Sequence, residues 1–466
     1  MKGRAYSLDA LRGYAILTMV LSATVAGSIL PAWMYHAQTP PPTHAFNPEL
    51  PGLTWVDLVF PFFLFAMGAA FPFSIRKRKE KGESELRLVY DALKRGVQLT
   101  FFAIFIQHFY PYMLSSPQDM RAWLLAIACF AVLFPMFMRL PFPLPAWGHT
   151  AVKLGAYAVA VVMLLTVNYA DGREFSLYTS NIIILLLANM AIFGSIIYLF
   201  TMDNKWASIA VLLVLAGIIL SSEVEGSWTS TLFGFTPVSW MYRFDYLKYL
   251  FIVLPGSLAG DFLLEWMNRR GHEEGEDKND RKAYAALSLS VAIIVCNLVG
   301  LYNRWLHVNL VVNILLLLAG WWLLRKSAGS ASLWKELFNM GAFLLLVGLC
   351  LEPFQGGIKK DVATFSYFFV TSGLACMALI VFHILCDYFR CQRSTAWLVM
   401  SGQNPMIAYV AGDLLVIPVL QMTGVFPLLS YLHSNPWLGF LQGLLLTSLS
   451  LLVTIFFTRI KWFWRT

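Results

Sequence analysis

Histidine and aspartate side chains near the start of the chain are the strongest candidates for proton-transfer chemistry. His36 and His44 lie in a proline-rich stretch, and Asp57 opens the apolar segment that follows it. Histidine is the side chain whose ordinary pKa lies nearest neutrality, so in a shielded pocket it can take a proton from an attacking amine or hydroxyl. Asp57 can orient such an imidazole, or it can cap the helix that it begins. We treat all three as candidate catalytic residues, with solvated or helix-capping roles as the alternative.

Two oppositely charged residues lie inside the first apolar segment. Asp9 and Arg12 are three residues apart and share one helix face, so they can pair with each other or hold a neighbouring helix. An ionisable group within a membrane is costly and is therefore a functional hypothesis by default.

Later polar segments offer candidates for substrate contact. The stretch Tyr242–Lys248 contains Asp245 and mixes aromatic with charged side chains. Such groups anchor helices at a membrane interface or bind sugar rings, and both roles stay open. The segment Ser401–Pro405 interrupts an apolar run, which a membrane tolerates where the freed backbone is buried or lines a cavity. We therefore expect Asn404 to face a polar pocket.

The composition identifies the surroundings in which these residues act. Of the 466 residues, 58% are hydrophobic and 13% are charged, whereas a soluble chain is about 45–50% apolar and about 25% charged. Apolar runs of about 18–25 residues recur along the chain, each long enough to cross a bilayer as a helix. They do not alternate apolar with polar residues, which excludes an outer-membrane barrel. The sequence predicts an all-α polytopic membrane protein, a bundle of about 11–14 transmembrane helices.

The predicted spans are distributed over the whole chain. They are 8–30, 53–74, 92–114, 121–138, 149–168, 180–200, 205–221, 246–266, 284–302, 307–325, 336–352, 364–389, 396–420 and 437–459.

Basic residues indicate the orientation, because short cytoplasmic loops are enriched in Lys and Arg. Clusters follow the second span at 76–87, the eighth at 269–282 and the last at 459–465, whereas the loop 31–53 has no Lys or Arg. No cleavable signal peptide is apparent. We expect a multi-pass membrane protein with a cytoplasmic N-terminus and an outward-facing proline-rich loop.

One segment departs from this trend. Gln355–Asp361 carries two lysines, although the helix count places it outside, so either a span is miscounted or the lysines have a local role. We expect one integral membrane domain, 1–466, with a candidate inner-loop boundary at 267–283.

Motif absences narrow the chemistry. Six cysteines lie in or beside apolar runs without a CxxC spacing, so they predict neither a disulfide framework nor a zinc site. No Walker loop, GxGxxG, GxSxG or HExxH motif is present, which removes ATPase, dehydrogenase, serine hydrolase and zincin readings. The net charge of +8 falls in short loops and indicates topology, not nucleic acid. We expect no metal.

Taken together, these segments resemble a family of transmembrane acetyltransferases related to lysosomal heparan-α-glucosaminide N-acetyltransferase, in a bacterial, DUF5009-like branch. Ser7–Gly13 resembles the family's opening S-x-D-x-x-R-G, and Asp57–Gly68 is very close to its D-L-V-F-P-x-F-x-F-x-x-G. Weaker matches extend over nearly the whole chain, at Lys94-Arg95, Phe244-Asp245 with Gly260, Lys360 with Ser366-Tyr367, and Gly402-Gln403-Asn404 with Tyr409.

The resemblance implies that an acetyl group moves from cytoplasmic acetyl-CoA, the co-substrate, to the amino group of a glucosamine-type sugar or glycan on the periplasmic side. It also implies a location in a bacterial inner (cytoplasmic) membrane, contact with membrane lipid and a homodimer. The implied acetyl-CoA contacts are Asp9, Arg12, Arg76 and Arg95, and the implied acceptor contacts are Ser22, Asp245, Lys360 and Asn404.

The family places its histidine in a His-Ala pair between the first two spans, and this chain has two such pairs. Measured from Asp9, His36 fits the family spacing, whereas measured back from Asp57, His44 fits better. We favour His36, because Pro31–Tyr35 continues the first span into it.

Several alternatives stay open. The histidine removes the amine's proton during direct attack, or an acetyl-histidine forms first. Ser22 stands where the family usually has Asn, and Gly412-Asp413 where it has His-Glu, so the acceptor is open. The other functions are a transporter of a sugar or lipid-linked glycan, whose intramembrane polar groups bind cargo, and an O-acetyltransferase of envelope glycans.

Overall fold

The protein is a bundle of helices. The computed structural model describes residues 4–25, 30–138, 141, 143, 145–270, 279–327 and 329–466. Within these ranges the regular elements are helical, and strand pairing is limited to one isolated bridge between Met138 and Trp464. Eleven helices of the described chain are long and apolar enough to cross a membrane. The prediction of an all-α polytopic membrane protein is confirmed.

Three further long helices of the described chain fall outside the group of eleven: α1 (Tyr6–Thr24), α4 (Glu85–Phe109) and the shorter apolar helix α9 (Lys205–Ser221). The elements of the spanning group are α2 (Trp55–Gly68) continued by η2 (Pro72–Arg76) and α3 (Lys77–Glu80), α6 (Met120–Phe137), α7 (Ala146–Thr166), α8 (Ile182–Thr201), η4 (Phe244–Tyr249) with α11 (Leu250–Arg270), α12 (Asp280–Tyr302), α13 (Leu306–Leu324), α14 (Ser330–Cys350), α15 (Phe365–His383) with η6 (Ile384–Tyr388), α17 (Pro405–Ala411) with η7 (Gly412–Val416) and α18 (Ile417–Met422), and α20 (Pro436–Arg459). Shorter elements include η1 (Ala32–Met34), α5 (Pro111–Leu114), α10 (Trp228–Phe233), η5 (Phe354–Gly356), α16 (Gln392–Gln403) and α19 (Val425–Ser430).

Most predicted spans have a matching helix, and one prediction is wrong. The span 396–420 is not continuous, because Asn404 leaves the helical conformation between α16 and α17, where Pro405 cannot donate a backbone hydrogen bond. The first span is shorter than predicted, since α1 ends at Thr24. The candidate boundary at 267–283 falls largely on 271–278, which lie outside the described residues.

Glycines bring two pairs of helices into backbone contact. A Cβ atom at Gly68 of α2 would lie 2.0 Å from the carbonyl oxygen of Val253 in α11, and one at Gly402 of α16 would lie 1.8 Å from that of Asp9 in α1. Small residues permit this approach between membrane helices. The motif glycines therefore set the crossings of α2 with α11 and of α1 with α16.

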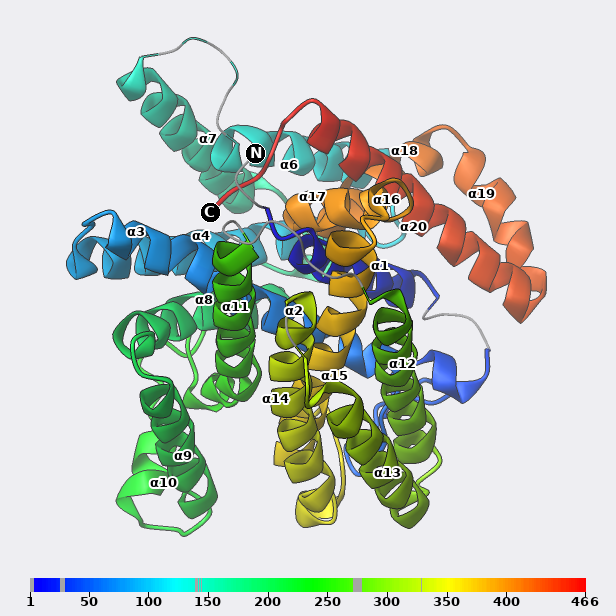
Figure 1. The fold of residues 1–466 in the computed structure, drawn as a ribbon. Helices are drawn as coiled ribbons and strands as arrows, with labels where there is room; N and C mark the ends of the chain where they lie inside the picture. Colours follow the sequence, from blue (N-terminus) through cyan, green and yellow to red (C-terminus); the bar gives the residue numbers. More distant parts are fainter. Residues whose placement is uncertain are drawn as a thin grey trace.

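Polar side chains join α12 to α13. Asn297 donates to Asn313 Oδ1 at 2.7 Å, Asn309 donates to Asn297 Oδ1 at 3.3 Å, and all three side chains are buried. Amide hydrogen bonds hold helices together where no water competes. In Figure 1 these two helices run side by side at the edge of the central group formed by α2, α14 and α15.

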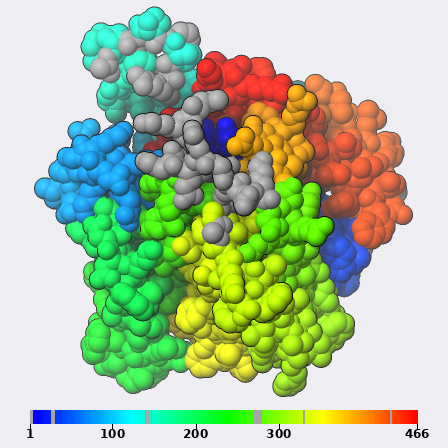
Figure 2. Space-filling model, viewed as in Figure 1, coloured from blue at the N-terminus to red at the C-terminus, as the bar shows by residue number. Residues whose placement is uncertain are grey.

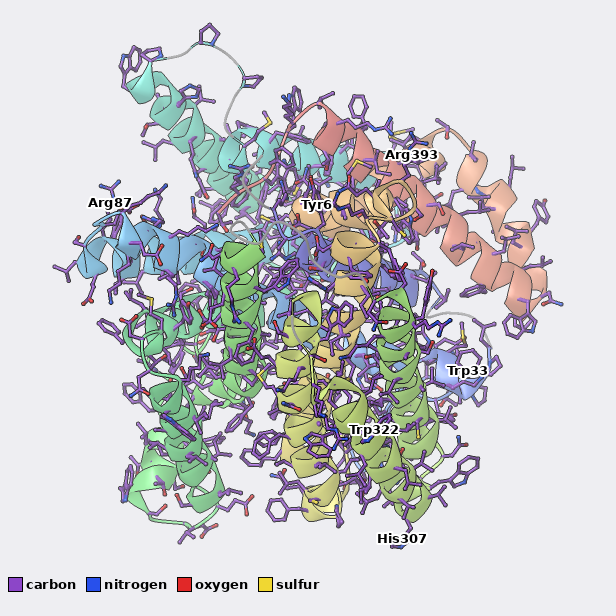
Figure 3. All side chains as sticks on the ribbon, viewed as in Figure 1. Tyr6, Trp33, Arg87, His307, Trp322 and Arg393 are labelled. Atoms are coloured by element: carbon purple, nitrogen blue, oxygen red, sulfur yellow. The ribbon has the colours of Figure 1, made fainter. Side chains whose placement is uncertain are left out.

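Charged side chains gather where several helices end. Lys79 reaches Asp203 at 3.7 Å, Lys205 reaches Glu265 at 3.7 Å, and Arg269 reaches Glu336 at 3.8 Å. Arg87 and Arg393 lie in the upper half of the view in Figure 3, whereas His307 lies at its lower limit. We call the charged end, defined by Arg78, Lys79, Lys205 and Arg269, the basic end.

Helix α7 stands apart from the body at the upper left of Figure 2.

Candidate functional site

Asp57 uses its two carboxylate oxygens for different purposes. Oδ2 accepts from the backbone N–H of Thr54 at 3.0 Å, from the Thr54 hydroxyl at 3.1 Å and from the backbone N–H of Ala37 at 3.3 Å. These bonds close the N-terminus of α2 as a capping arrangement. Oδ1 lies 3.3 Å from His36 Nδ1. The two roles considered for Asp57, a helix cap and a partner of histidine, therefore occur together.

His36 lies between two carboxylates. Its Nδ1 atom lies near Asp57, and its Nε2 atom lies 3.3 Å from Asp361 Oδ2. The backbone N–H of Gln38 donates to Nδ1 at 3.1 Å, which in the neutral ring assigns the proton to Nε2. Among the described residues neither Asp57 Oδ1 nor His36 Nε2 has a hydrogen-bond partner of good geometry. Protonation of the ring would let both carboxylates compensate its charge.

Asp361 is the accessible member of this group. Its side chain is 53% exposed, compared with 15% for His36 and 1% for Asp57. Interaction with the His36 ring holds the pKa of Asp361 below its usual value, with further lowering by the charge of Lys360, although partial burial acts in the opposite direction. The Asp361 carboxylate is therefore ionised at neutral pH and faces the outside of the site.

The amide of Gln38 clamps the loop of His36 to the loop of Asp361. Gln38 Oε1 accepts from the backbone N–H of Asp361 at 2.9 Å, and Gln38 Nε2 donates to the Asp361 carbonyl oxygen. A second backbone bond joins Gly52 N–H to the Ile358 carbonyl at 2.9 Å. These contacts fix Asp361 through its main chain and leave its carboxylate available.

One of the two lysines of this second loop has an ion-pair partner in the first loop. Lys359 Nζ lies 3.3 Å from Glu49 Oε2 in the first loop. Arg304 pairs with the buried Glu352, which also accepts from the backbone N–H of Ile358 at 3.2 Å. The two lysines that oppose the positive-inside trend therefore lie in a loop that is bonded to the proline-rich loop. We call the two joined loops, 31–54 and 351–364, the cap.

His44 has a different environment from His36. Its ring packs edge-on against Tyr35 with centroids 4.5 Å apart, and its backbone N–H donates to Pro40. The ionic contact of Asp57 among the described residues is with His36. Trp33, which Figure 3 labels and which is half exposed, lies in η1 just before His36. The structure thus brings His36, and not His44, into contact with the candidate carboxylates.

A cavity of about 340 Å³ lies inside the bundle, and its lining residue Phe60 is one helical turn from Asp57. Arg12 and Arg95 line it together with Arg465 from the C-terminal segment, while Met19 and Phe60 line its apolar part. Arg12 donates to the backbone carbonyls of Ala66 and Gly402 at 3.3 Å each, which places it beside the far end of α2 from Asp57.

Arg95 is the cationic group of this cavity that is least satisfied. Its Nε atom is buried without a hydrogen-bond partner among the described residues. Arg95 also lines a second cavity of about 200 Å³, in which Ser74 and Thr466 again take part. An unpaired guanidinium that lines two adjoining cavities is suited to bind an anionic ligand.

Other predicted acetyl-CoA contacts have partners within the protein. Asp9 pairs with Arg4 at 2.6 Å and lies 3.7 Å from Arg12. Arg76 lies 3.2 Å from Asp261 and donates to the Met202 carbonyl, and it is absent from the lining of both cavities. The structure therefore brings Arg12 and Arg95 together and separates Arg76 from them.

The predicted acceptor contacts are dispersed. Asp245 pairs with Lys248 at 2.6 Å, and the Ser22 hydroxyl donates to the Met19 carbonyl within α1. Lys360 directly precedes Asp361, which contacts His36. Among the four predicted acceptor contacts that the structure describes, Lys360 is therefore the one next to the histidine site.

Asn404 corrects an expectation. Its amide donates to the Trp462 carbonyl at 2.8 Å and accepts from the Trp464 backbone N–H at 3.2 Å. Both ends of the amide therefore hold the C-terminal segment and do not face a polar pocket. Its neighbours Gln403 and Pro405 line the cavity instead.

Sequence reasoning missed Asp361, Gln38 and Arg465. Asp361 had a signal, because it ends the charged segment that disagreed with the helix count. No group of three or more His, Cys, Asp or Glu side chains is placed to hold a metal ion in the part of the chain that the structure describes.

Comparison with known families gives one match. The model of a family described as a domain of unknown function, DUF5009, matches residues 4–263, which is more than half of the chain. No curated protein matches the sequence. The matched region contains His36, Asp57, Arg12 and Arg95, whereas Asp361 lies beyond it.

Proposed function

The chain belongs to the DUF5009 family, and from that premise we propose that it is a transmembrane acetyltransferase. It moves an acetyl group from cytoplasmic acetyl-CoA to the amino group of a glucosamine-type sugar or glycan on the opposite side of the membrane.

The observation that carries this proposal is a cavity that is lined by Arg12 and Arg95 and extends to Phe60, near the end of α2 that holds Asp57. Arg12 contacts Ala66 near one end of α2, and Asp57 lies at the other end, about 14 Å away at about 1.5 Å per residue. Phe60, which lines the cavity, is one helical turn from Asp57. A donor with charged phosphates and a long, slender acyl-bearing arm fits such a route. Arg12 and Arg95 would hold the phosphates, and the thioester would approach His36.

The cap supplies the acid–base chemistry of the proposed reaction. His36 takes a proton from the acceptor nitrogen as that nitrogen forms a bond to the acetyl carbonyl carbon. The carbon–sulfur bond then breaks, and CoA leaves as a thiolate that is neutralised by a proton. Asp57 Oδ1, 3.3 Å from Nδ1, stabilises the imidazolium and fixes the ring. Acetylation of His36 followed by transfer to the amine is the two-step form of the same proposal.

The proposed orientation of the protein in the membrane follows from the position of its lysines and arginines. The basic end carries the lysines and arginines that short cytoplasmic loops favour. Its assignment to the cytoplasm places acetyl-CoA entry at that end and the cap on the outside. We propose a bacterial inner membrane as the location.

A transfer assay tests the function and names the histidine. Purified protein receives labelled acetyl-CoA with a panel of amino sugars and glycan fragments, beside the variants His36→Ala and His44→Ala. We expect transfer to fall by at least about 10²-fold in His36→Ala and by less than about threefold in His44→Ala. His44→Ala is the matched control, since it removes the same ring from the same loop.

Two results would change the proposal. Transfer to hydroxyl acceptors alone would identify an O-acetyltransferase. The absence of both transfer and acetyl-CoA binding, with uptake of a sugar into proteoliposomes, would identify a transporter.

A further inference from the structure

Asp361 occupies the place where the acceptor must meet the histidine. Asp57 covers the Nδ1 side of His36, so Nε2 is the nitrogen available to a substrate. Asp361 Oδ2 lies 3.3 Å from that nitrogen. The more exposed of the two carboxylates is thus next to the working nitrogen of the ring, on the side from which an outside molecule arrives.

The surrounding charges leave this carboxylate available. Lys359 is engaged with Glu49 across the cap. Lys360 acts on Asp361 through its charge, but no ion pair joins the two among the described residues. Asp57 adds a second negative charge on the far side of the ring. Tyr249, the last residue of η4, and Tyr367 of α15 are further titratable groups that interact with the charge of Asp361. A small cation is the partner that this arrangement lacks.

We propose that Asp361 binds the ammonium group of the acceptor beside His36, so that the site selects cationic amines over neutral sugars. This inference rests on the proposed acetyl transfer. It adds a residue that accounts for selectivity. The carboxylate attracts the positive charge of an ammonium ion, and a hydroxyl acceptor has no such charge.

The proton balance of the reaction agrees with this arrangement. An amino sugar reaches the protein as R–NH3⁺, which cannot attack a carbonyl until it loses a proton. Asp361 holds the ammonium. In the neutral ring described above Nε2 carries the proton, so acceptance at Nε2 requires the other tautomer, with the ring proton on Nδ1 facing Asp57 Oδ1; Nε2 then takes the first proton and releases it to water. The neutral ring then takes the second proton as the carbon–nitrogen bond forms, and passes it to the CoA thiolate when the carbon–sulfur bond breaks. The products are the amide, CoA thiol and one proton, which His36 releases to water.

Direct binding tests the inference without turnover. Calorimetry on the detergent-solubilised full chain compares glucosamine hydrochloride with N-acetylglucosamine, which has the same ring and no positive charge. We expect Asp361→Asn to weaken glucosamine binding by about tenfold and to leave N-acetylglucosamine binding within about twofold. In turnover the KM for glucosamine rises by a similar factor, while the KM for acetyl-CoA is unchanged.

Two further variants act as controls. Glu49→Gln removes a carboxylate of the same cap whose side chain is 85% exposed and pairs with Lys359, and we expect it to change glucosamine affinity by less than about twofold. Asp361→Glu keeps the charge and should retain most of the affinity, which excludes simple misfolding. The main-chain clamp through Gln38 is preserved in both Asp361 variants.

The outcomes distinguish a failure of the Asp361 site from a failure of the proposed acetyl transfer. Glucosamine binding that is insensitive to Asp361→Asn, or that falls equally for the neutral sugar, overturns the role of Asp361. Glucosamine binding that needs Asp361, without acetyl transfer to any acceptor, overturns the proposed transferase and leaves the ammonium site standing.

Discussion

Asp57 and His36 form one unit in which helix capping and ring orientation use opposite oxygens of a single carboxylate. Oδ2 is saturated by Thr54 and the Ala37 backbone, and Oδ1 lies 3.3 Å from Nδ1 without a donor. The position of the loop histidine is thereby tied to the start of α2. Tyr367 strengthens the same point, since its hydroxyl donates to the Asp57 backbone carbonyl at 2.8 Å.

Asp57→Asn should separate these two roles. An amide oxygen can still accept from the Thr54 backbone, so we expect the fold to persist, but a neutral side chain cannot stabilise the imidazolium. The transfer rate should fall by about 10²–10⁴-fold, measured as kcat with saturating acetyl-CoA, beside a thermal unfolding curve. Asp245→Asn serves as the control, because Asp245 forms its ion pair with Lys248 and not with His36. Equal losses in both variants would argue against a specific role for Asp57.

Arg95→Gln should weaken acetyl-CoA binding by about tenfold or more, because a charge-assisted bond to phosphate is removed from a buried position. Equilibrium binding of acetyl-CoA to the solubilised protein measures the change. Arg87→Gln is the matched control, since Arg87 is on the same helix and 72% exposed. An unchanged dissociation constant for Arg95→Gln would mean that the cavity does not hold the donor.

Gly402→Ala should destabilise the bundle by about 1–3 kcal/mol, because its Cβ would lie 1.8 Å from the Asp9 carbonyl oxygen. The two helices can avoid the clash only by moving apart. Gly155→Ala in α7 is the control, since no atom lies within 4 Å of its added Cβ. Thermal unfolding in one detergent compares the two, and similar melting temperatures would contradict the close crossing of α1 and α16.

Acid should remove the contribution of Asp361 to stability. Its folded pKa is lower than the usual 3.8, so folding favours the ionised form, and the stabilisation is present above the unfolded pKa and lost as pH falls through the folded one. We expect the wild type to unfold at a higher temperature than Asp361→Asn at pH 7. That difference should shrink below about pH 4. A difference that grows on acidification would reverse the assigned sign.

Much of the fold was predictable, because apolar length is set by bilayer thickness. Thirteen of the predicted spans have helices in similar positions, and the discontinuity near Pro405 was visible in Ser401–Pro405. The error at 396–420 arose because the break at Ser401–Pro405 was recognised but the predicted span was still drawn through it as one helix. The helix-capping contact of Asp57 was predictable from local sequence, because Thr54 is only three residues before it.

The rest of the site depends on contacts between distant segments. Nothing in the local pattern around His36 indicates that its second carboxylate is Asp361, because that neighbour is brought in by the packing of α15 against α2 and by the Gln38 clamp. Arg76 and Arg95 look alike in sequence, yet Asp261 neutralises one and the other is left facing a cavity. Charge alone could not distinguish them.

The Gln38 clamp also bears on how the protein is made. Gln38 and Asp361 are 323 residues apart, so the ribosome must synthesise most of the chain before the cap can close around His36. An incomplete nascent chain lacks Asp361, the carboxylate proposed to bind the acceptor ammonium. On that proposal, we expect a product cut short before α15 to be inactive in acetyl transfer.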